Sequence, residues 1–413
     1  MANSRKDDKG RVLRKGESYR KKNEMYQYSY TDESGKRQYV YAKDLMHLRQ
    51  KETELLRDRL DGIDSKKAEV LTLNNVFDKY ISGRIDLKPW IKANYEMQYN
   101  AHVRKNIGNR KIKEIRYSDM VNFYTNLLQE QNLSMGTVEY IQRVIRPAFE
   151  MAVRDNIIRY NPTEKVLRQL STKVKKKKIV RKALTLEQQR AFLSFLDEHP
   201  VFKHWKPIFT FLIGTGVRVS EFCGLTWNDV DLENDIITIG HQVIYFAGKA
   251  NRGKQRKFIS EPKTEAGIRK IPIVKEVREA LEENKRYLKE QGIEGWREID
   301  GYSNFVFLNK FGDVHTQSGL DRNLHRLVDA YNDYEIRRAN KKGKSPLLLP
   351  NISCHNLRHT FCTRICENES NLKVIQELMG HVDIQTTMNI YAEVSDERRK
   401  SSLNAMSDNM ILF

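Results

Sequence analysis

The ten residues Ser353–Cys362 read SCHNLRHTFC and hold two histidines, one arginine and two cysteines, with Cys366 following four residues later. Such a stretch suits one of two kinds of site. Histidine and cysteine are common zinc ligands, whereas an arginine fork beside a histidine suits a phosphate. If the stretch is a helix, His355 and Arg358 lie one turn apart on the same face. The two alternatives predict different folds and functions for the rest of the chain.

The zinc alternative meets a geometric difficulty. On one helix, the metal-ligand side chains of one face would be His355, His359, Cys362 and Cys366. Ligands in line at 1.5 Å per residue spread over about 16 Å, too far to surround one tetrahedral ion. Away from this stretch, Cys223 stands in an apolar context, and no glutamate follows the first histidine as in zinc hydrolases. We therefore expect buried core cysteines and no metal or other cofactor, with a zinc-dependent nuclease as the alternative.

Charge is the strongest signal of the composition. The 413 residues hold 73 lysines and arginines against 54 acids, a formal net charge of +19. This surplus favours a polyanionic partner, although a merely basic protein has the same composition. No apolar run approaches the length of a membrane span and no secretory segment opens the chain. Four cysteines are too few for a disulfide scaffold, so we expect a cytoplasmic protein with no membrane partner.

The N-terminal half divides into two patterns. Residues 1–43 combine basic clusters with alternating tyrosines on either side of a glycine-containing turn, which predicts a β-hairpin, and residues 44–61 are helical. Residues 72–161 carry apolar stripes at helical spacing up to Asn161-Pro162. These stripes are more typical of a core than of a functional site.

The C-terminal half follows a basic run. Residues 173–182, KVKKKKIVRK, hold seven basic residues and no acid, which indicates a linker that is solvated or lies along a phosphate backbone. A capping box at Thr185 and Gln188 begins the next helix. We expect strands at 235–246, 269–273 and 304–308, with the remainder mainly helical.

The phosphate alternative needs partners for His355 and Arg358. Four further segments supply them: Arg218 in TGVRVSEFCGL, with Glu221 one turn on to hold it, Lys263 in PKTEAGIRKIPI, His381 directly after Gly380, and Tyr391 near the C-terminus. Taken singly, each has an ordinary structural explanation, such as a core tyrosine, a solvated turn lysine or a helix-capping histidine.

Taken in order, Arg, Lys, His-x-x-Arg, Gly-His and Tyr resemble the catalytic set of the tyrosine recombinase (phage integrase) family. The segments HNLRHTFCT and LMGHVDIQTTMNIY look familial too, and nearly the whole chain is similar to integrases of Gram-positive conjugative transposons. His381 and Tyr391 are ten residues apart, where many members of the family show nine. The placement of the helix expected to carry Tyr391, the tyrosine helix, therefore stays open.

The resemblance implies a multidomain fold, mainly α with small β-sheets. Residues 1–70 would form an arm-type DNA-binding domain of a β-sheet plus a helix, and 72–165 a helical core-binding domain. Residues 166–182 would be a basic linker. Residues 183–413 would be the α+β tyrosine recombinase catalytic domain with a C-terminal tail.

The resemblance also implies the chemistry. The residues that would carry it are Arg218, Lys263, His355, Arg358, His381 and Tyr391. Tyr391 would attack the scissile phosphate and form a 3′-phosphotyrosine, with His355 accepting its proton. The two arginines and His381 would stabilise the charged transition state, and Lys263 would protonate the leaving oxygen.

The implied function is excision and integration of a mobile element through Holliday-junction strand exchange, in the cytoplasm of a bacterium. The implied partners are double-stranded DNA (element ends, the circular-intermediate junction and target sites), three further copies in a homotetramer, and an excisionase. Candidate DNA-binding residues of the arm and linker are Arg20, Lys21, Lys22, Lys175, Lys176, Lys177 and Lys178. The alternatives are a type IB topoisomerase and a non-catalytic DNA-binding regulator.

Overall fold

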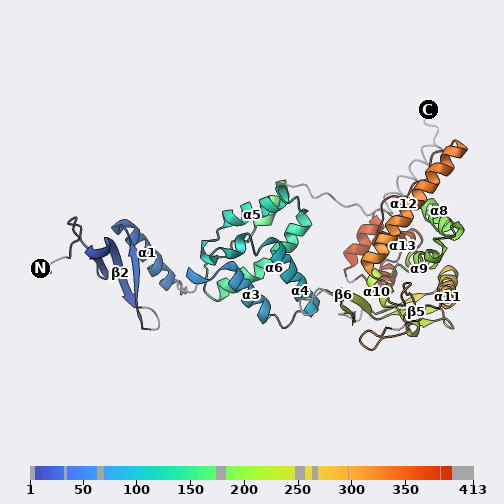
Figure 1. Ribbon diagram of the computed structural model, residues 1–413, viewed down its shortest axis with the longest axis horizontal. Coiled ribbons are helices and arrows are strands. Elements are labelled where there is room, and N and C mark those ends of the chain that lie inside the picture. Colours follow the sequence, from blue (N-terminus) through green and yellow to red (C-terminus); the bar gives the residue numbers. More distant parts are fainter. Residues whose placement is uncertain are drawn as a thin grey trace. The chain divides into compact units, whose positions relative to one another are not determined.

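The computed structural model describes residues 5–31, 35–62, 69–173, 183–246, 256–262, 268–295, 297–381 and 383–392 (Figure 1). The chain divides into two compact units, 1–177 and 178–413. Lys263, the linker lysines 175–178 and the C-terminal tail lie outside the described residues. Among the helices that the described ranges contain, none has the length and apolar character that crossing a membrane requires.

The N-terminal part is a three-stranded antiparallel sheet covered by one helix. Its elements are β1 (Glu17–Arg20), η1 (Lys21–Asn23), β2 (Met25–Thr31), β3 (Arg37–Ala42) and α1 (Leu45–Leu60). The predicted hairpin is β2 and β3, and β1 adds a third strand beside β2. Helix α1 packs on the face that carries Tyr26 and Ala42. Because side chains alternate along a strand, Tyr39 and Tyr41 lie on the opposite face, where both are exposed.

The following part is all-helical, as the apolar stripes predict. Its elements are α3 (Leu73–Gly83), α4 (Pro89–His102), η2 (Ile107–Asn109), η3 (Ile112–Glu114), α5 (Tyr117–Gln129), α6 (Met135–Arg154) and α7 (Val166–Lys173). The stripes meet in one core, in which Phe77 stacks on Tyr99 with ring centroids 3.6 Å apart. Helix α7 covers the beginning of the segment 166–182 predicted to be a linker, because Val166 and Leu170 are buried in this core. The prediction of a linker was wrong for 166–173.

The second unit combines helices with two small sheets. Its helices are α8 (Leu186–Glu198), η4 (Lys203–Trp205), α9 (Lys206–Thr215), α10 (Val219–Gly224), η5 (Trp227–Asp229), α11 (Lys275–Glu290), α12 (Gln317–Lys342), α13 (Cys354–Asn368) and α14 (Leu372–Met379). Its strands are β4 (Val230–Asp231), β5 (Ile236–Ile239), β6 (Gln242–Phe246), β7 (Arg256–Ser260) and β8 (Arg269–Pro272). The buried helix α9 packs against α11 and α13, and α13 packs against α12 and α14. The predicted capping box of Thr185 and Gln188 begins α8.

Two of the three predicted strand segments differ from the structure. The segment 235–246 is divided at residues 240–241, so that β5 pairs in the order β4-β5-β8 while β6 pairs with β7. The segment 304–308 is no strand. Phe305, Val306 and Phe307 are all buried, so the chain does not alternate between two faces. The segment forms isolated β-bridges instead, of Phe305 with Thr226 and of Leu308 with Val314, and the Val306 amide donates to the Leu225 carbonyl.

Candidate active site

Arg218 is held at a helix start by its own neighbour. It is the N-cap of α10, where its amide donates to Oε2 of Glu221 at 2.8 Å and its Nη1 donates to Oε1 at 2.7 Å. Nη2 donates to the carbonyl of Gly380 at 2.7 Å. The side chain is still 38% exposed. Arg218 is therefore fixed in position while part of its guanidinium faces solvent.

Glu221 joins Arg218 to a second arginine, Arg269, at the start of β8. Both terminal nitrogens of Arg269 donate to the Glu221 carboxylate, at 2.7 and 3.2 Å, and its Nε donates to the Leu378 carbonyl at 3.0 Å. Burial raises the pKa of Glu221, but the hydrogen bonds from Arg269 and the charges of Arg269 and Arg218 outweigh it and lower that pKa to about 2. Glu221 is thus ionised at neutral pH and holds both arginines.

Arg358 reaches the same place from α13. It is only 4% exposed, and its terminal nitrogens donate to the carbonyls of Gly216, at 2.7 Å, and of Met379. Burial and the nearby Arg218 charge lower the pKa of Arg358 to about 9, which leaves it protonated at neutral pH. Since a guanidinium has five N–H groups, Arg358 keeps donors beyond these two bonds.

The carbonyls that hold these arginines come from two glycine-containing turns. Gly216 ends α9 and Gly380 ends α14, both in the left-handed conformation with φ near 60°. A Cβ on Gly216 would overlap the Phe361 ring, and one on Gly380 would lie 3.0 Å from Nη1 of Arg269. The two glycines therefore allow the close approach of α13 and β8.

His381 follows directly after Gly380 and contacts the segment that carries Tyr391. Its Nδ1 lies 2.9 Å from the Thr387 hydroxyl oxygen, and its carbonyl accepts from the Gln376 side chain at 2.9 Å. Burial and the charges of Arg358 and Arg218 lower the pKa of His381 to about 4, so the ring is neutral at pH 7. The charges of Arg269 and His355 lower the pKa of His381 further.

Tyr391 lies one turn after Thr387 on a helix that begins at residue 384, so the two share a face. Tyr391 is half-buried and packs at the edge of a small cluster formed by Cys362, Cys366 and residues of α14. The contact between His381 and Thr387 thus joins the turn at Gly380 to the helix that carries Tyr391.

His355 and the cysteines of the opening stretch have different environments. His355 is exposed in the first turn of α13, one turn before Arg358, and its charge contributes to lowering the pKa of His381. Cys362 and Cys366 are buried in the apolar cluster, where the hydrogen bond from Cys366 and burial raise the pKa of Cys362. Burial likewise raises the pKa of Cys354. These thiols are buried core residues, as the sequence analysis expected.

The structure thus brings three of the six predicted catalytic residues, Arg218, Arg358 and His381, together at the turn of residues 379–381. His355 lies one turn before Arg358 on α13, and Tyr391 lies one turn after Thr387, the contact of His381. Lys263, the sixth, falls outside the described residues. Sequence reasoning missed Arg269, Thr387 and Gln376. Arg269 carried no signal, because its partner Glu221 is 48 residues away. The site offers fixed positive charge and a neutral imidazole, a combination suited to a phosphate group.

Comparison with known proteins gives the same assignment. Residues 182–398 match the phage integrase family, and residues 1–63 match the DNA binding domain of Tn916 integrase. The transposase from transposon Tn916 of Enterococcus faecalis and that from transposon Tn1545 of Streptococcus pneumoniae are each 30% identical to this chain over 98% of both lengths.

The chain belongs to the phage integrase family. It is a tyrosine-type site-specific recombinase, and the predicted resemblance to transposon integrases is confirmed. The Tn1549 transposon integrase, solved in complex with transposon right end DNA, is 31% identical, with a TM-score of 0.68 over 82% of this chain and 100% of that one. This likeness confirms the predicted fold class for the helical and catalytic parts.

Proposed function

We propose that this recombinase excises and integrates a conjugative transposon through a 3′-phosphotyrosine intermediate and Holliday-junction strand exchange. The observation that carries the proposal is the convergence of Arg218, Arg358 and His381 on the turn at residues 378–381, next to the helix of Tyr391. The relatives from transposons Tn916 and Tn1545, and the Tn1549 integrase bound to transposon DNA, support a transposon as the substrate.

In the proposed first step, Oη of Tyr391 attacks the scissile phosphorus and the bond from phosphorus to O5′ breaks. His355, exposed one turn before Arg358 on α13, takes the phenolic proton. A base is needed because a free tyrosine has a pKa near 10. Lys263 gives a proton to the leaving 5′-oxygen. The reverse reaction with a new 5′-hydroxyl reseals the strand, and no nucleotide cofactor is consumed because the phosphodiester energy is kept in the tyrosyl bond.

The transition state gathers negative charge on the non-bridging phosphate oxygens. Arg218 is partly exposed and tied to Glu221, so it can bind an oxygen without first being ordered. Arg358 is fixed by two carbonyls and adds a second positive charge. If the Thr387 hydroxyl donates to Nδ1 of His381, the proton of the neutral ring lies on Nε2, and this N–H donates to the phosphate.

The N-terminal sheet is the proposed arm-type DNA reader. The face opposite α1 carries Arg37, Tyr39 and Tyr41, and the guanidinium of Arg20 lies 5.6 Å from the Tyr41 ring centroid. Lys21 and Lys22 follow on the exposed η1 turn. A small sheet of this kind fits a major groove. The match of residues 1–63 to the DNA binding domain of Tn916 integrase supports this role.

Further partners belong to the same proposal. Solved complexes of Tn1549 integrase with circular intermediate DNA, 31% identical to this chain, support a circular intermediate as a substrate. Recombination of two duplexes requires four tyrosines, so we propose a homotetramer on DNA, with the segment 174–182 crossing the phosphate backbone. We further propose an excisionase that selects the direction of the reaction, and a cytoplasmic location.

The test is a plasmid assay that separates recombination from relaxation. One plasmid carries both ends of the element that encodes this protein, and a supercoiled plasmid of equal size carries neither. The proposal expects excised circles from the first plasmid only. A type IB topoisomerase would instead relax both plasmids without exchanging strands. A non-catalytic regulator would change neither, and either of these results contradicts the proposal.

A further inference from the structure

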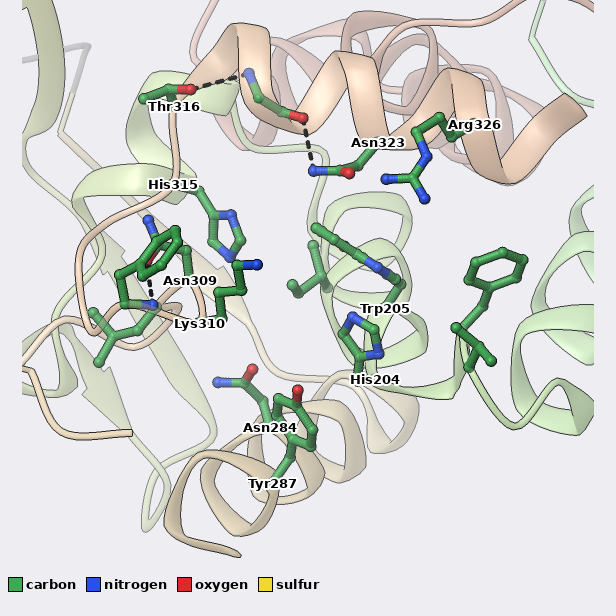
Figure 2. A pocket seen from close by; sticks show the side chains of 16 residues that line it. His204, Trp205, Asn284, Tyr287, Asn309, Lys310, His315, Thr316, Asn323 and Arg326 are labelled. Carbon is green, nitrogen blue, oxygen red and sulfur yellow. Dashed lines mark hydrogen bonds between the residues drawn. The ribbon is translucent and has the colours of Figure 1, made fainter. Parts of the chain in front are cut away.

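The second unit contains a cavity of about 420 Å³ away from the Arg218 cluster. It lies between η4, α11, the loop 308–316 and the first turns of α12 (Figure 2). Aromatic rings form one side: His204 stacks on Tyr287 with an interplanar angle of 14°, and Trp205 lies beside His204. A volume of this size holds a small ligand of the order of a mononucleotide. Flat aromatic walls favour a planar ring.

Two buried polar side chains that line the cavity beside these rings, His315 next to Trp205 and Asn284 one turn before Tyr287 on α11, carry hydrogen-bond acceptors (Figure 2). His315 is 8% exposed, and its Nε2 has no hydrogen-bond partner among the described residues. Burial lowers the pKa of His315 to about 4, so the ring is neutral at pH 7. The hydrogen bond of the ring to the Leu308 backbone acts in the opposite direction on this pKa. Because Nε2 has no partner, that bond places the proton on Nδ1 and leaves a lone pair on Nε2. Asn284 uses its amide N–H on the Val306 carbonyl, which leaves its Oδ1 as an acceptor. A buried acceptor without a donor is costly, so Nε2 of His315 favours a ligand with an N–H group, to which Oδ1 of Asn284 offers a second acceptor.

The entrance of the cavity is positively charged. Lys310 and Arg326 are exposed lining residues on opposite sides of it in Figure 2, and neither forms an ion pair with any described residue. Thr316 and Gly319 add the N-terminal turn of α12, whose dipole attracts an anion. No aspartate or glutamate is among the lining residues. The entrance therefore suits a phosphate.

We propose that this cavity binds a purine nucleotide that carries an exocyclic amino group, with adenosine monophosphate as its smallest complete form. The purine lies against His204, Trp205 and Tyr287, and the amino group donates to His315 and Asn284. The phosphate lies between Lys310 and Arg326. The same chemistry is offered by a free nucleotide and by an adenine that has left the stack of bound DNA.

The test uses the full-length protein and calorimetric titration with AMP, adenosine and IMP. Adenosine lacks the phosphate, and IMP replaces the amino group with a carbonyl oxygen that repels the two acceptors. We expect AMP to bind in one-to-one stoichiometry, and adenosine and IMP each to bind at least about tenfold more weakly. Equal affinity for AMP and IMP would overturn the proposal, because the buried acceptors would then not read the base.

A variant separates the cavity from general attraction of anions by a basic protein. In Lys310→Ala/Arg326→Ala, both exposed side chains of the entrance are lost, and AMP affinity falls at least about tenfold. The matched control Lys341→Ala/Lys342→Ala removes two exposed charges at the far end of α12 and leaves AMP binding unchanged. Equal losses in both double variants would overturn the proposal. Thermal unfolding of each variant checks that it is folded.

A second arm identifies the source of the base. A duplex with one unpaired adenine is compared with the same duplex fully paired, in wild type and in the entrance double variant. Binding of free AMP supports a soluble nucleotide. A preference for the unpaired adenine that the entrance variant loses supports a base of the DNA. The proposal is contradicted if AMP does not bind at concentrations up to ~1 mM and the protein also does not prefer the duplex with the unpaired adenine.

Discussion

Replacing Glu221 by glutamine tests the part of the site that sequence reasoning described least completely. Glu221 accepts hydrogen bonds from Arg218 and Arg269, and the Arg269 side chain is only 4% exposed. Glu221→Gln keeps the size of the side chain but removes its charge. Arg269 is then a buried cation beside Arg218 and Arg358 without a counter-charge, which is the costly case for a buried ion pair.

The size of the effect follows from the pKa of Glu221. That pKa is lowered from 4.5 to about 2 in the folded protein. At 1.36 kcal/mol per unit, the charged form stabilises the fold by about 3 kcal/mol, which agrees with the cost of about 3–5 kcal/mol for breaking a buried pair. Because the folded pKa is the lower one, this stability is complete above pH 4.5. It is lost as the pH falls from 4.5 through 2.

The assay is urea unfolding followed by tryptophan fluorescence. The chain has four tryptophans, and in a Trp90→Phe background all those that remain lie in the second unit. We expect Glu221→Gln to lower the free energy of unfolding of this unit by about 3 kcal/mol at pH 7 and by progressively less toward pH 2. The matched control Glu279→Gln removes one partner of the exposed pair with Lys275, 3.9 Å apart, and has little effect.

Two results would refute this reasoning. A loss below about 1 kcal/mol at pH 7 would mean that Glu221 does not hold a buried charge. A loss of the same size at every pH would mean that the variant damages packing rather than an ion pair. If the variant loses stability but still cleaves DNA as fast as wild type, then Glu221 stabilises the fold but is not needed to position Arg218.

Further predictions concern the two turns and the tyrosine helix. Thr387→Val removes the hydroxyl beside Nδ1 of His381, and we expect strand cleavage to slow by up to about 100-fold. Thr387→Ser keeps the hydroxyl and should keep most of the cleavage rate. Single-turnover kinetics measure both variants. Equal activity of the two variants would show that the hydroxyl does not orient His381. Gly216→Ala places a Cβ against the Phe361 ring at a left-handed residue, and we expect a loss of about 1–3 kcal/mol in urea unfolding and weaker cleavage, because the Gly216 carbonyl holds Arg358. A variant as stable as wild type would refute the need for glycine there.

Much of the fold was predictable because its signals are local. The helices of residues 72–161 show apolar stripes over several turns, and the capping box of Thr185 and Gln188 lies within four residues of chain. The spacing of His355 and Arg358 also depends on one helical turn alone. The strand predicted at 304–308 failed for the opposite reason. Its apolar run is buried on every side by tertiary contacts, so propensity did not decide its conformation.

The site itself was only partly predictable. The sequence order of Arg218, His355, Arg358, His381 and Tyr391 indicated a phosphate site through the resemblance to a family. The bonds that hold the site came from the structure: Arg269 meets Glu221 across 48 residues, and Arg358 donates to a carbonyl 142 residues away. The spacing of apolar residues along the sequence does not predict contacts between residues so far apart. The role of Lys263 stays a prediction.

The central claim is that Tyr391 is the nucleophile at the Arg218–Arg358–His381 cluster. The most direct measurement is a covalent trap: a duplex of an element end is nicked beyond the scissile phosphate so that the short 5′-hydroxyl fragment diffuses away. Protein and DNA are mixed with excess chelator, and the adduct is mapped by peptide mass spectrometry. The account predicts an adduct on Tyr391 in wild type and none in Tyr391→Phe, which still binds the duplex. An adduct on another residue, or cleavage that appears only when zinc is restored, would contradict it.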